Sequence, residues 1–585
     1  MRNFIRLFKL IDKNHKGFIK KTIILSLLTG LLPIFNVIAP KLIIDEYQSL
    51  RRLNIMFMIA LIALVLAFLN KIINLYSNNY YERTMQVFND ELSYKVNEKV
   101  LSLPIEMTDS KSIQDKTQQA LYAVGSTYSL LEFMSFASGA VITGIFSIVI
   151  LIKLNFIIPL ILIILVILNK PLSKIIKDNE KDYQKRSAGD IRVYNYYFKF
   201  AKDYKYSKDI KIFNAEKMIL EKAAYHMNEM FKANHKYFTK NGAMLGLINI
   251  INNMGIVGSF IYITYRLIQN TITISNFTLY FNCLNKLIEA LQSFQQYYAD
   301  LAGLNVSLNT LYEFLDIEDS HEEGDINDID LSTVRLEFKD VSFKYPSSND
   351  YILKNCSFII NPGETVALVG RNGAGKSTIV KLLCKFYEPS SGEILLNDTN
   401  IKDIDTKYYY KILSPAFQDF RLFPFRIDEN VATNIKDDIN KCDYEQMDAS
   451  FKLLNIKKWV DNLPNGKENY LTTVFDNNGV SPSGGLGQKL ALARSMQHKG
   501  KFIIMDEPTS ALDPRSEQEI FENMLKITED QTSLFISHRL SSTKYADRII
   551  VCNNGHIEEN GSHTELLKAN KLYAEMFNTQ KELYT

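Results

Sequence analysis

Long apolar stretches dominate the first half of the chain. Six of them, nearly free of charged residues, approach the about 20 residues that an α-helix needs to cross a bilayer. They comprise residues 22–40, 53–70, 133–152, 154–169, 241–265 and 267–285. One such stretch could be a buried helix of a soluble protein, but six in succession predict six membrane-spanning helices. The sixth is the most polar, which a span tolerates when it faces other helices or a water-filled cavity.

Two long charged intervals, residues 71–132 and 170–240, separate the second span from the third and the fourth span from the fifth. They lack long Gly- or Pro-rich breaks, so each interval predicts a pair of helices that leaves the membrane and returns. Short helices at the tips, near residues 107–115 and 206–215, are predicted to touch the C-terminal half. Because the other connections are short, both excursions are expected on the same side of the membrane.

The segment before the first span is basic. It contains Arg2, Arg6, Lys9, Lys13, Lys16, Lys20 and Lys21 against Asp12. An excess of basic residues favours the cytosolic side of a membrane. Six spans return the chain to that side, so the N-terminus, both excursions and the C-terminal half are all predicted to be cytosolic. The pattern predicts a multi-pass integral membrane protein, and the cell membrane is its expected location.

From Val334 onward the pattern changes to short β-type runs and helical segments. The acidic stretch DIEDSHEEGDINDID before it has no apolar periodicity and is interpreted as a solvated connector. We therefore predict an α-helical transmembrane bundle over residues 1–314, a linker over 315–332 and an α/β domain over 333–585. The net charge of +2 gives no overall attraction to nucleic acid, and the five scattered cysteines lack metal-site spacing.

A phosphate-binding loop follows the apolar strand VALV at residues 366–369 and precedes the helical run IVKLLCKF. The loop matches G-x-x-x-x-G-K-S in the strand–loop–helix context that this motif requires. Its glycines let backbone N–H groups surround a phosphate, and the following helix directs its positive end to the same place. Lys376 is predicted to reach the β- and γ-phosphates, and Ser377 to bind Mg²⁺. The predicted nucleotide-binding residues are Gly370, Arg371, Asn372, Gly373, Ala374, Gly375, Lys376, Ser377 and Thr378.

A second element, which ends in two acidic residues, follows about 130 residues later as FIIMDE at residues 502–507. Its four apolar residues predict a buried parallel strand, whose carboxyl end is where ligands bind in open α/β sheets. Asp506 is predicted to hold Mg²⁺ and Glu507 to orient or polarise the attacking water.

With these two elements the second half resembles the ABC ATPase family, and further motifs match in the same order. Together they span about residues 336–561. The matching residues are Ser483, Gly484 and Gly485 of the signature motif, Gln418 of the Q-loop, Asp513 of the D-loop, His538 of the switch region, and Tyr345, which in this family stacks on adenine.

The resemblance implies a P-loop ATPase domain of the ABC type that uses ATP and Mg²⁺. In this family two such domains face each other, and the signature of one grips the γ-phosphate of the ATP held by the other. A second half-transporter is therefore the implied partner. The implied catalytic residues are Glu507, His538 and Lys376, and the implied Mg²⁺ ligands are Ser377, Gln418 and Asp506. Six spans fused ahead of the ATPase resemble an exporter half-transporter.

The signature departs from the family pattern Leu-Ser-Gly-Gly-Gln at two positions, Pro482 and Leu486. Proline is acceptable at a helix start, but Leu486 lacks the amide of the usual glutamine. Two interpretations stay open. The variant is tolerated in a homodimer, or the chain pairs in a heterodimer with a partner that supplies the stronger signature, since this chain keeps its glutamate, Glu507.

The leading functional hypothesis is ATP-driven export of a peptide, a lipid or an amphipathic small molecule. The alternative is an ATP-gated or regulatory membrane protein without net pumping, which the intact Lys376, Glu507 and His538 disfavour. A soluble ABC protein acting on DNA or ribosomes is inconsistent with six spans. The polar residues Asn252, Asn253, Gln269 and Asn276 are candidates for facing a substrate cavity, and hydrogen bonds between helices explain them equally well.

Overall fold

A computed structural model describes residues 2–127, 138–202, 204–318, 324–346, 348–433, 442–507, 531–537 and 539–582. The chain forms two compact units. The helical unit comprises residues 1–103 and 111–318, and the sheet unit comprises residues 104–110 and 319–585.

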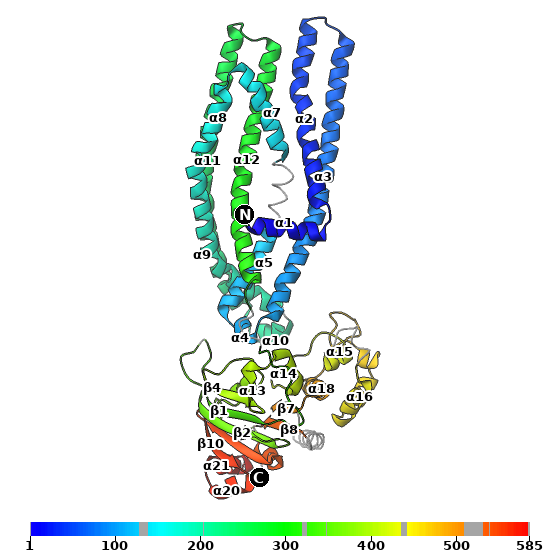
Figure 1. The fold of residues 1–585 in the computed structure, drawn as a ribbon, viewed down its shortest axis with the longest axis vertical. Helices are drawn as coiled ribbons and strands as arrows, with labels where there is room; N and C mark the ends of the chain where they lie inside the picture. Colours follow the sequence, from blue (N-terminus) through cyan, green and yellow to red (C-terminus); the bar gives the residue numbers. More distant parts are fainter. Residues whose placement is uncertain are drawn as a thin grey trace. The chain divides into compact units, whose positions relative to one another are not determined.

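Long helices make up the described part of the helical unit (Figure 1). They are α1 (Arg2–Asn14), α2 (Phe18–Gln48), α3 (Leu53–Ser102), α5 (Lys111–Ser126), α7 (Ser138–Leu154), α8 (Ile157–Leu168), α9 (Lys170–Lys202), α10 (Tyr204–Ile212), α11 (Glu216–Ile268) and α12 (Ile274–Leu315).

The described residues of both excursions are mainly helical, as the charged intervals predicted. Helix α3 runs for 50 residues and passes from its apolar part directly into the first excursion. Beyond the apolar part its buried residues recur every three or four positions, which is the stripe of an amphipathic helix. They are Ser77, Tyr81, Thr84, Met85, Phe88, Leu92 and Val96.

Four helices of the described residues are long and apolar enough to cross a membrane. They are Phe18–Gln48, Leu53–Ser102, Ile157–Glu180 and Glu216–Ile268, and Gly139–Leu154 is a shorter apolar helix. These correspond to the first five predicted spans, although residues 133–137 of the third lie outside the described residues. The predicted sixth span falls on α12, which is too polar to satisfy the same criterion.

The predicted start of the sixth span, residue 267, is wrong. Helix α11 continues to Ile268, and α12 begins only at Ile274. Thr273 ends the turn between them, because its hydroxyl accepts a hydrogen bond of 3.2 Å from the backbone N–H of Asn276 and so caps α12. The fourth span is also shifted: the Asn155 side chain accepts from the N–H of Ile157, and α8 begins there rather than at residue 154.

Polar side chains join the helices of this unit. The Asn169 amide donates to the Asn252 side chain at 2.8 Å, and both residues are buried. Asn179 donates in the same way to Asn241 at 3.0 Å. Of the residues proposed to face a substrate cavity, Asn252 therefore forms a hydrogen bond between helices.

The sheet unit contains two sheets. The first is antiparallel, in the order β2–β1–β4–β5, and the second has the order β10–β9–β3–β8–β7–β6. In the second sheet β9, β3, β8, β7 and β6 are parallel, and β10 is antiparallel to β9. The strands are β1 (Leu336–Phe343), β2 (Leu353–Ile360), β3 (Thr365–Val369), β4 (Ser391–Leu396), β5 (Thr399–Asn400), β6 (Leu413–Ala416), β7 (Phe502–Asp506), β8 (Thr532–Ile536), β9 (Arg548–Asn553) and β10 (His556–Gly561).

The described residues of this unit also form short helices. The α-helices are α4 (Ile105–Thr108), α13 (Lys376–Leu383), α14 (Thr406–Ile412), α15 (Ile427–Ala432), α16 (Tyr444–Leu453), α17 (Lys457–Asp461), α18 (Gly484–Gln497), α20 (His563–Ala569) and α21 (Leu572–Glu582). The 3₁₀-helices among these residues are η2 (Ile401–Asp403), η4 (Gly466–Glu468) and η5 (Leu540–Tyr545). Every residue of β3, β7 and β8 is buried, which fixes the position of the loops at their carboxyl ends.

The second part of the predicted linker is mostly exposed, as expected, but it is also tied to the sheet unit. Ile326 donates its N–H to the carbonyl of Asp403 at 3.1 Å and accepts from the N–H of Asp405 at 2.9 Å. Ile329 and Leu331 pack against the core of the sheet unit. The acidic residues around Ile329 and Leu331 concealed this packing in the sequence.

Candidate functional site

The phosphate-binding loop lies between β3 and α13, as the sequence predicted. Gly370, Gly373 and Gly375 all have positive φ angles of 154°, 79° and 107°. A Cβ atom on Gly370 would lie 2.1 Å from the carbonyl oxygen of Cys552, and one on Gly375 would lie 2.6 Å from the Leu353 side chain. Only glycine fits these two positions, so the loop keeps its narrow curve and leaves its backbone open to a ligand.

Lys376 links the end of the phosphate-binding loop to its beginning through hydrogen bonds. Its ammonium group donates to the carbonyl oxygens of Gly370 at 2.9 Å and of Arg371 at 3.1 Å. Burial lowers the pKa of Lys376, while the negative charges of Glu507 and Asp506 raise it. The cation is therefore enclosed next to two carboxylates, in the place where a phosphate would bring further negative charge.

Asp506 ends β7 and fits the role of a Mg²⁺ ligand. It is buried, and its Oδ1 atom has no hydrogen-bond partner among the described residues. Burial raises the pKa of Asp506 to about 6, with further increases from the charges of Glu507 and Asp419, and a hydrogen bond from Ser377 lowers it. A buried, unpaired carboxylate oxygen beside a hydroxyl suits a hard cation such as Mg²⁺.

Glu507 is held by contacts to two glutamines. Gln418 donates its side-chain amide to Glu507 Oε2 at 2.7 Å, and Gln488 donates to the Glu507 carbonyl at 3.2 Å. The backbone N–H of Glu507 donates to Ile536 of the neighbouring strand at 3.1 Å. The structure therefore brings the predicted Q-loop glutamine into contact with the predicted catalytic glutamate, and it adds Gln488 from the start of α18.

Tyr345 lies beside the first two turns of the phosphate-loop helix α13. Its hydroxyl is 3.3 Å from Thr378 Oγ1, and its ring packs edge-to-face against Phe343 and Tyr387. The ring is half-buried, so one part of it is accessible for the predicted stacking on a base.

The signature residues form the beginning of α18. Ser483 is the N-cap, with its hydroxyl accepting from the N–H of Leu486 at 3.4 Å. Ser483 and Gly484 are exposed, while Leu486 packs against the core that includes Leu490. The unusual Leu486 therefore contributes to packing, and the polar start of the helix remains open to another molecule.

Two predicted site residues, Asp513 and His538, lie outside the described residues, as does the rest of 508–530. Arg371, predicted from the loop sequence, forms an exposed ion pair of 3.1 Å with Glu575 of α21.

Sequence reasoning missed three residues near the site. Asp419 adds a charge that raises the pKa of Asp506, Gln488 supports Glu507, and the Cys552 thiol donates to the Ala374 carbonyl at 2.9 Å. Asp419 could have been identified because it directly follows Gln418. A contact between residues far apart in the sequence, such as that of Cys552 with Ala374, leaves no signal in a single sequence.

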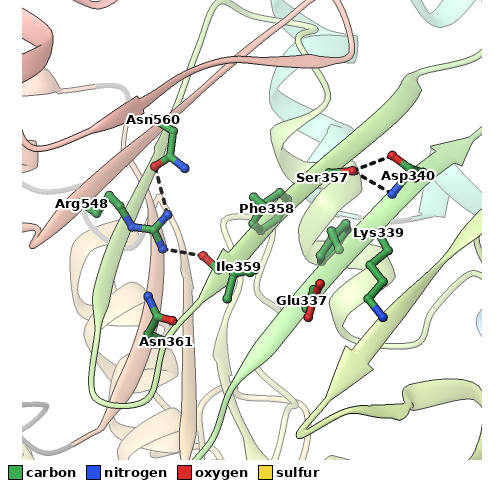
Figure 2. Close-up of a pocket in the computed structure, with 10 residues that line it drawn as sticks. Glu337, Lys339, Asp340, Ser357, Phe358, Ile359, Asn361, Arg548 and Asn560 are labelled. Atoms are coloured by element: carbon green, nitrogen blue, oxygen red, sulfur yellow. Dashed lines mark hydrogen bonds between the residues drawn. The ribbon is translucent and has the colours of Figure 1, made fainter.

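A hollow of about 490 Å³ lies elsewhere in the sheet unit, over β1 and β2 (Figure 2). Its most prominent charge, Arg548, is already bonded to Glu364 at 2.5 and 2.8 Å, to Asn560 at 3.0 Å and to the Ile359 carbonyl. None of the phosphate-loop residues lines it. The hollow is therefore separate from the candidate nucleotide site.

The phosphate loop lies beside the buried, acidic end of β7, and the same chain has apolar helices of membrane-spanning length. These two features define a membrane protein that uses a nucleoside triphosphate. The model of the ABC transporter family matches residues 353–510, and that of the ABC transporter transmembrane region matches residues 21–290. Together they match well over half of the 585 residues.

The chain is also similar to known transport proteins. The subtilin transport ATP-binding protein SpaT of Bacillus subtilis is 28% identical over 98% of this chain and 94% of that protein. An ATP-dependent lipid A-core flippase of Haemophilus influenzae (strain 86-028NP) is 33% identical, over 60% of this chain and 59% of the flippase. The structure of a bacterial Atm1-family ABC exporter with ATP bound superposes with a TM-score of 0.83 at 23% identity, over 96% of this chain and 98% of that chain.

The chain belongs to the ABC transporter family and has the exporter fold of a half-transporter. It is a multi-pass integral membrane protein whose C-terminal domain binds ATP and hydrolyses it to drive export.

Proposed function

We propose that this half-transporter exports a peptide. The observation that carries the proposal is the likeness to a subtilin transport protein along nearly the whole of both chains, 98% of this one and 94% of the other. The likeness to lipid A-core flippases covers only about three fifths of either chain, which makes a lipid the second candidate substrate.

Within the ATP site we propose that Asp506, Ser377 and Gln418 hold Mg²⁺, that Lys376 neutralises the β- and γ-phosphates, and that Glu507 orients the attacking water. Tyr345 stacks on adenine, and His538 and Asp513 complete the site. Bound Mg²⁺ neutralises the charge that develops on the transferred phosphate. The unpaired Oδ1 atom of Asp506 and the contact between Gln418 and Glu507 support these roles.

A second half-transporter completes the site in this proposal. At the start of α18, Ser483 and Gly484 are exposed and Gly485 is half-exposed, so these residues can contact an ATP bound to another chain. ATP draws two sheet units together, and hydrolysis releases them, so that the paired helical units alternate between the two sides of the cell membrane. The sheet unit and both excursions are cytosolic.

Leu486 favours a heterodimer over a homodimer. The Leu486 side chain packs against the core of its own domain, and it lacks the amide that the usual glutamine would place near the nucleotide. The partner then supplies the stronger signature, and this chain supplies Glu507.

Transport into inside-out membrane vesicles tests the proposed function. Vesicles containing the wild-type protein and its partner should accumulate fluorescently labelled subtilin when Mg-ATP is added. Vesicles with Glu507→Gln, which keeps the size of the side chain, should not.

A fluorescent phospholipid is assayed in parallel. ATP-dependent movement of the phospholipid without peptide uptake would replace the peptide with a lipid. ATP hydrolysis with neither movement would support the alternative, a regulatory membrane protein without net pumping.

A further inference from the structure

Helix α1 has two different faces. Leu7 and Ile11 are fully buried against the helical unit. On the opposite face Ile5, Lys9 and Lys13 are exposed. Residues on one face of an α-helix recur every three or four positions, so this division is that of an amphipathic helix.

The helix lies across the long helices of its unit rather than along them (Figure 1). Gly17, with a φ of 80°, forms the turn between α1 and α2. The apolar stretch of α2 starts a few residues later, at about Thr22. Helix α1 therefore lies at the level where the first span enters the bilayer, which is where interfacial helices lie.

Contacts fix α1 to two long helices. Arg6 forms two hydrogen bonds of 2.6 and 2.7 Å with Asp316, the C-cap of α12, and lies over the Tyr312 ring at 4.2 Å. Asn14 donates to Glu91 of α3 at 2.5 Å. Helix α12 is the last helix before the sheet unit in the sequence. A ligand that holds α1 therefore also restrains the start of the segment that connects α12 to the sheet unit.

Four lysines remain on the outer side of this segment. Lys9, Lys13, Lys16 and Lys20 are exposed, and no described residue forms an ion pair with any of them. Lys9 and Lys13 lie on the outer face of α1, Lys16 lies in the turn, and Lys20 lies in the first turn of α2, so the four charges cluster around the point where the two helices join. The single exposed carboxylate in this stretch is Asp12.

We propose that the lysine face, defined as Lys9, Lys13, Lys16 and Lys20, binds the headgroups of anionic phospholipids and that this binding stimulates ATP turnover. The charge of the face, its four unpaired ammonium groups and its level at the membrane edge are complementary to an anionic headgroup layer. Each lysine of a cluster next to a membrane span makes its own contribution to binding to an anionic membrane surface. The link from Arg6 to the end of α12 carries the effect toward the sheet unit.

The test uses the full-length protein in nanodiscs of phosphatidylcholine with increasing fractions of phosphatidylglycerol. Wild type is compared with a variant in which Lys9, Lys13, Lys16 and Lys20 are all replaced by glutamine. A control variant carries the same four changes at exposed lysines of the sheet unit, namely Lys452, Lys458, Lys501 and Lys571. Two quantities are measured: the phosphatidylglycerol retained by the purified protein, and the rate of ATP hydrolysis.

Wild type and the control should retain phosphatidylglycerol in preference to phosphatidylcholine and hydrolyse ATP faster as its fraction rises. The lysine-face variant should require roughly tenfold more of the anionic lipid for the same response. Equal retention and equal stimulation in all three proteins would overturn the proposal. Lipid retention is measured without ATP, so the result does not depend on what the protein exports.

Discussion

Two adjacent carboxylates at the end of β7 have different surroundings. Asp506 is buried and its pKa is raised to about 6, whereas Glu507 accepts a hydrogen bond from Gln418 at the exposed side of the site. These surroundings suit the proposed roles, in which Asp506 receives a cation and Glu507 acts on water. This division follows from burial, because the two residues are chemically alike.

Replacing Asp506 with asparagine should change stability in a pH-dependent way. The folded-state pKa of about 6 lies above the ordinary value of 3.8, so protonation of Asp506 favours the folded state. That stabilisation is complete below the pKa of the unfolded chain and is lost as the pH rises through about 6. Above this pH the ionised, buried carboxylate costs up to about 3 kcal/mol at 1.36 kcal/mol per pKa unit.

Asp506→Asn should therefore raise the melting temperature of the metal-free, nucleotide-free protein at neutral pH, and the two proteins should converge near pH 4. Differential scanning fluorimetry across this range measures the difference. Added Mg²⁺ with ATP should stabilise wild type much more than the variant. A variant that is less stable at neutral pH would contradict the assigned burial cost.

Glu507→Gln should slow ATP hydrolysis by about a hundredfold or more without weakening ATP binding, since the loss of a catalytic base has this size. The glutamine oxygen still accepts from Gln418, so the local structure is retained. Hydrolysis and ATP binding are measured on the full-length protein, with exposed Glu445→Gln as the control. Undiminished hydrolysis would exclude Glu507 as the catalytic residue.

The positions of these side chains were predictable where a sequence motif is tied to a fixed local structure, such as a strand followed by a loop and a helix. The glycine loop, Lys376 and the end of β7 lie where the sequence placed them, because an apolar strand followed by such residues leaves few alternatives. The hydrogen bond from Gln488 and the thiol contact of Cys552 were not predictable. Both depend on chain segments that meet only in the folded protein.

At the scale of elements, the short helix α4 links the two halves of the chain. It follows α3 and precedes α5 in the sequence, yet residues 104–110 belong to the sheet unit. Tyr387 donates to Asp109 at 3.3 Å, and burial together with the charges of Asp109 and Glu106 raises the pKa of Tyr387 to about 12. The tyrosine therefore remains a neutral donor at physiological pH.

Tyr387→Phe should reduce the stimulation of ATP hydrolysis by the transported substrate while basal hydrolysis remains. The phenylalanine keeps the ring contacts with Phe343 and Tyr345 and loses only the hydrogen bond, worth about 1 kcal/mol. Basal and substrate-stimulated rates are compared in the same vesicles. Asp109→Asn, which keeps an acceptor oxygen, should have a milder effect than Asp109→Ala. Full stimulation in Tyr387→Phe would show that this contact carries no coupling.

Elements were predicted best where the hydrophobic period was long and uninterrupted. The apolar part of α3 and its amphipathic continuation were both evident. The start of α12 was missed because a threonine cap, rather than a change in hydropathy, ends the turn before it. The packing of Ile329 and Leu331 was missed because two apolar residues among many acidic ones resemble a solvated segment.

At the scale of the whole molecule, the proposed function divides each ATP site between two chains. In this proposal the phosphate loop, Asp506 and Glu507 form one half of a site, and the start of α18 forms the other half for a different nucleotide. The central claim is therefore that ATP is held between two half-transporters.

Native mass spectrometry of the full-length Glu507→Gln protein, purified with its partner in the presence of Mg-ATP, tests this claim most directly. The account predicts a pair of half-transporters that retains two ATP molecules, and dissociation or loss of ATP when Ser483 is replaced by arginine in the same protein. A wild-type chain that stays monomeric with Mg-ATP while hydrolysing it steadily would contradict the account.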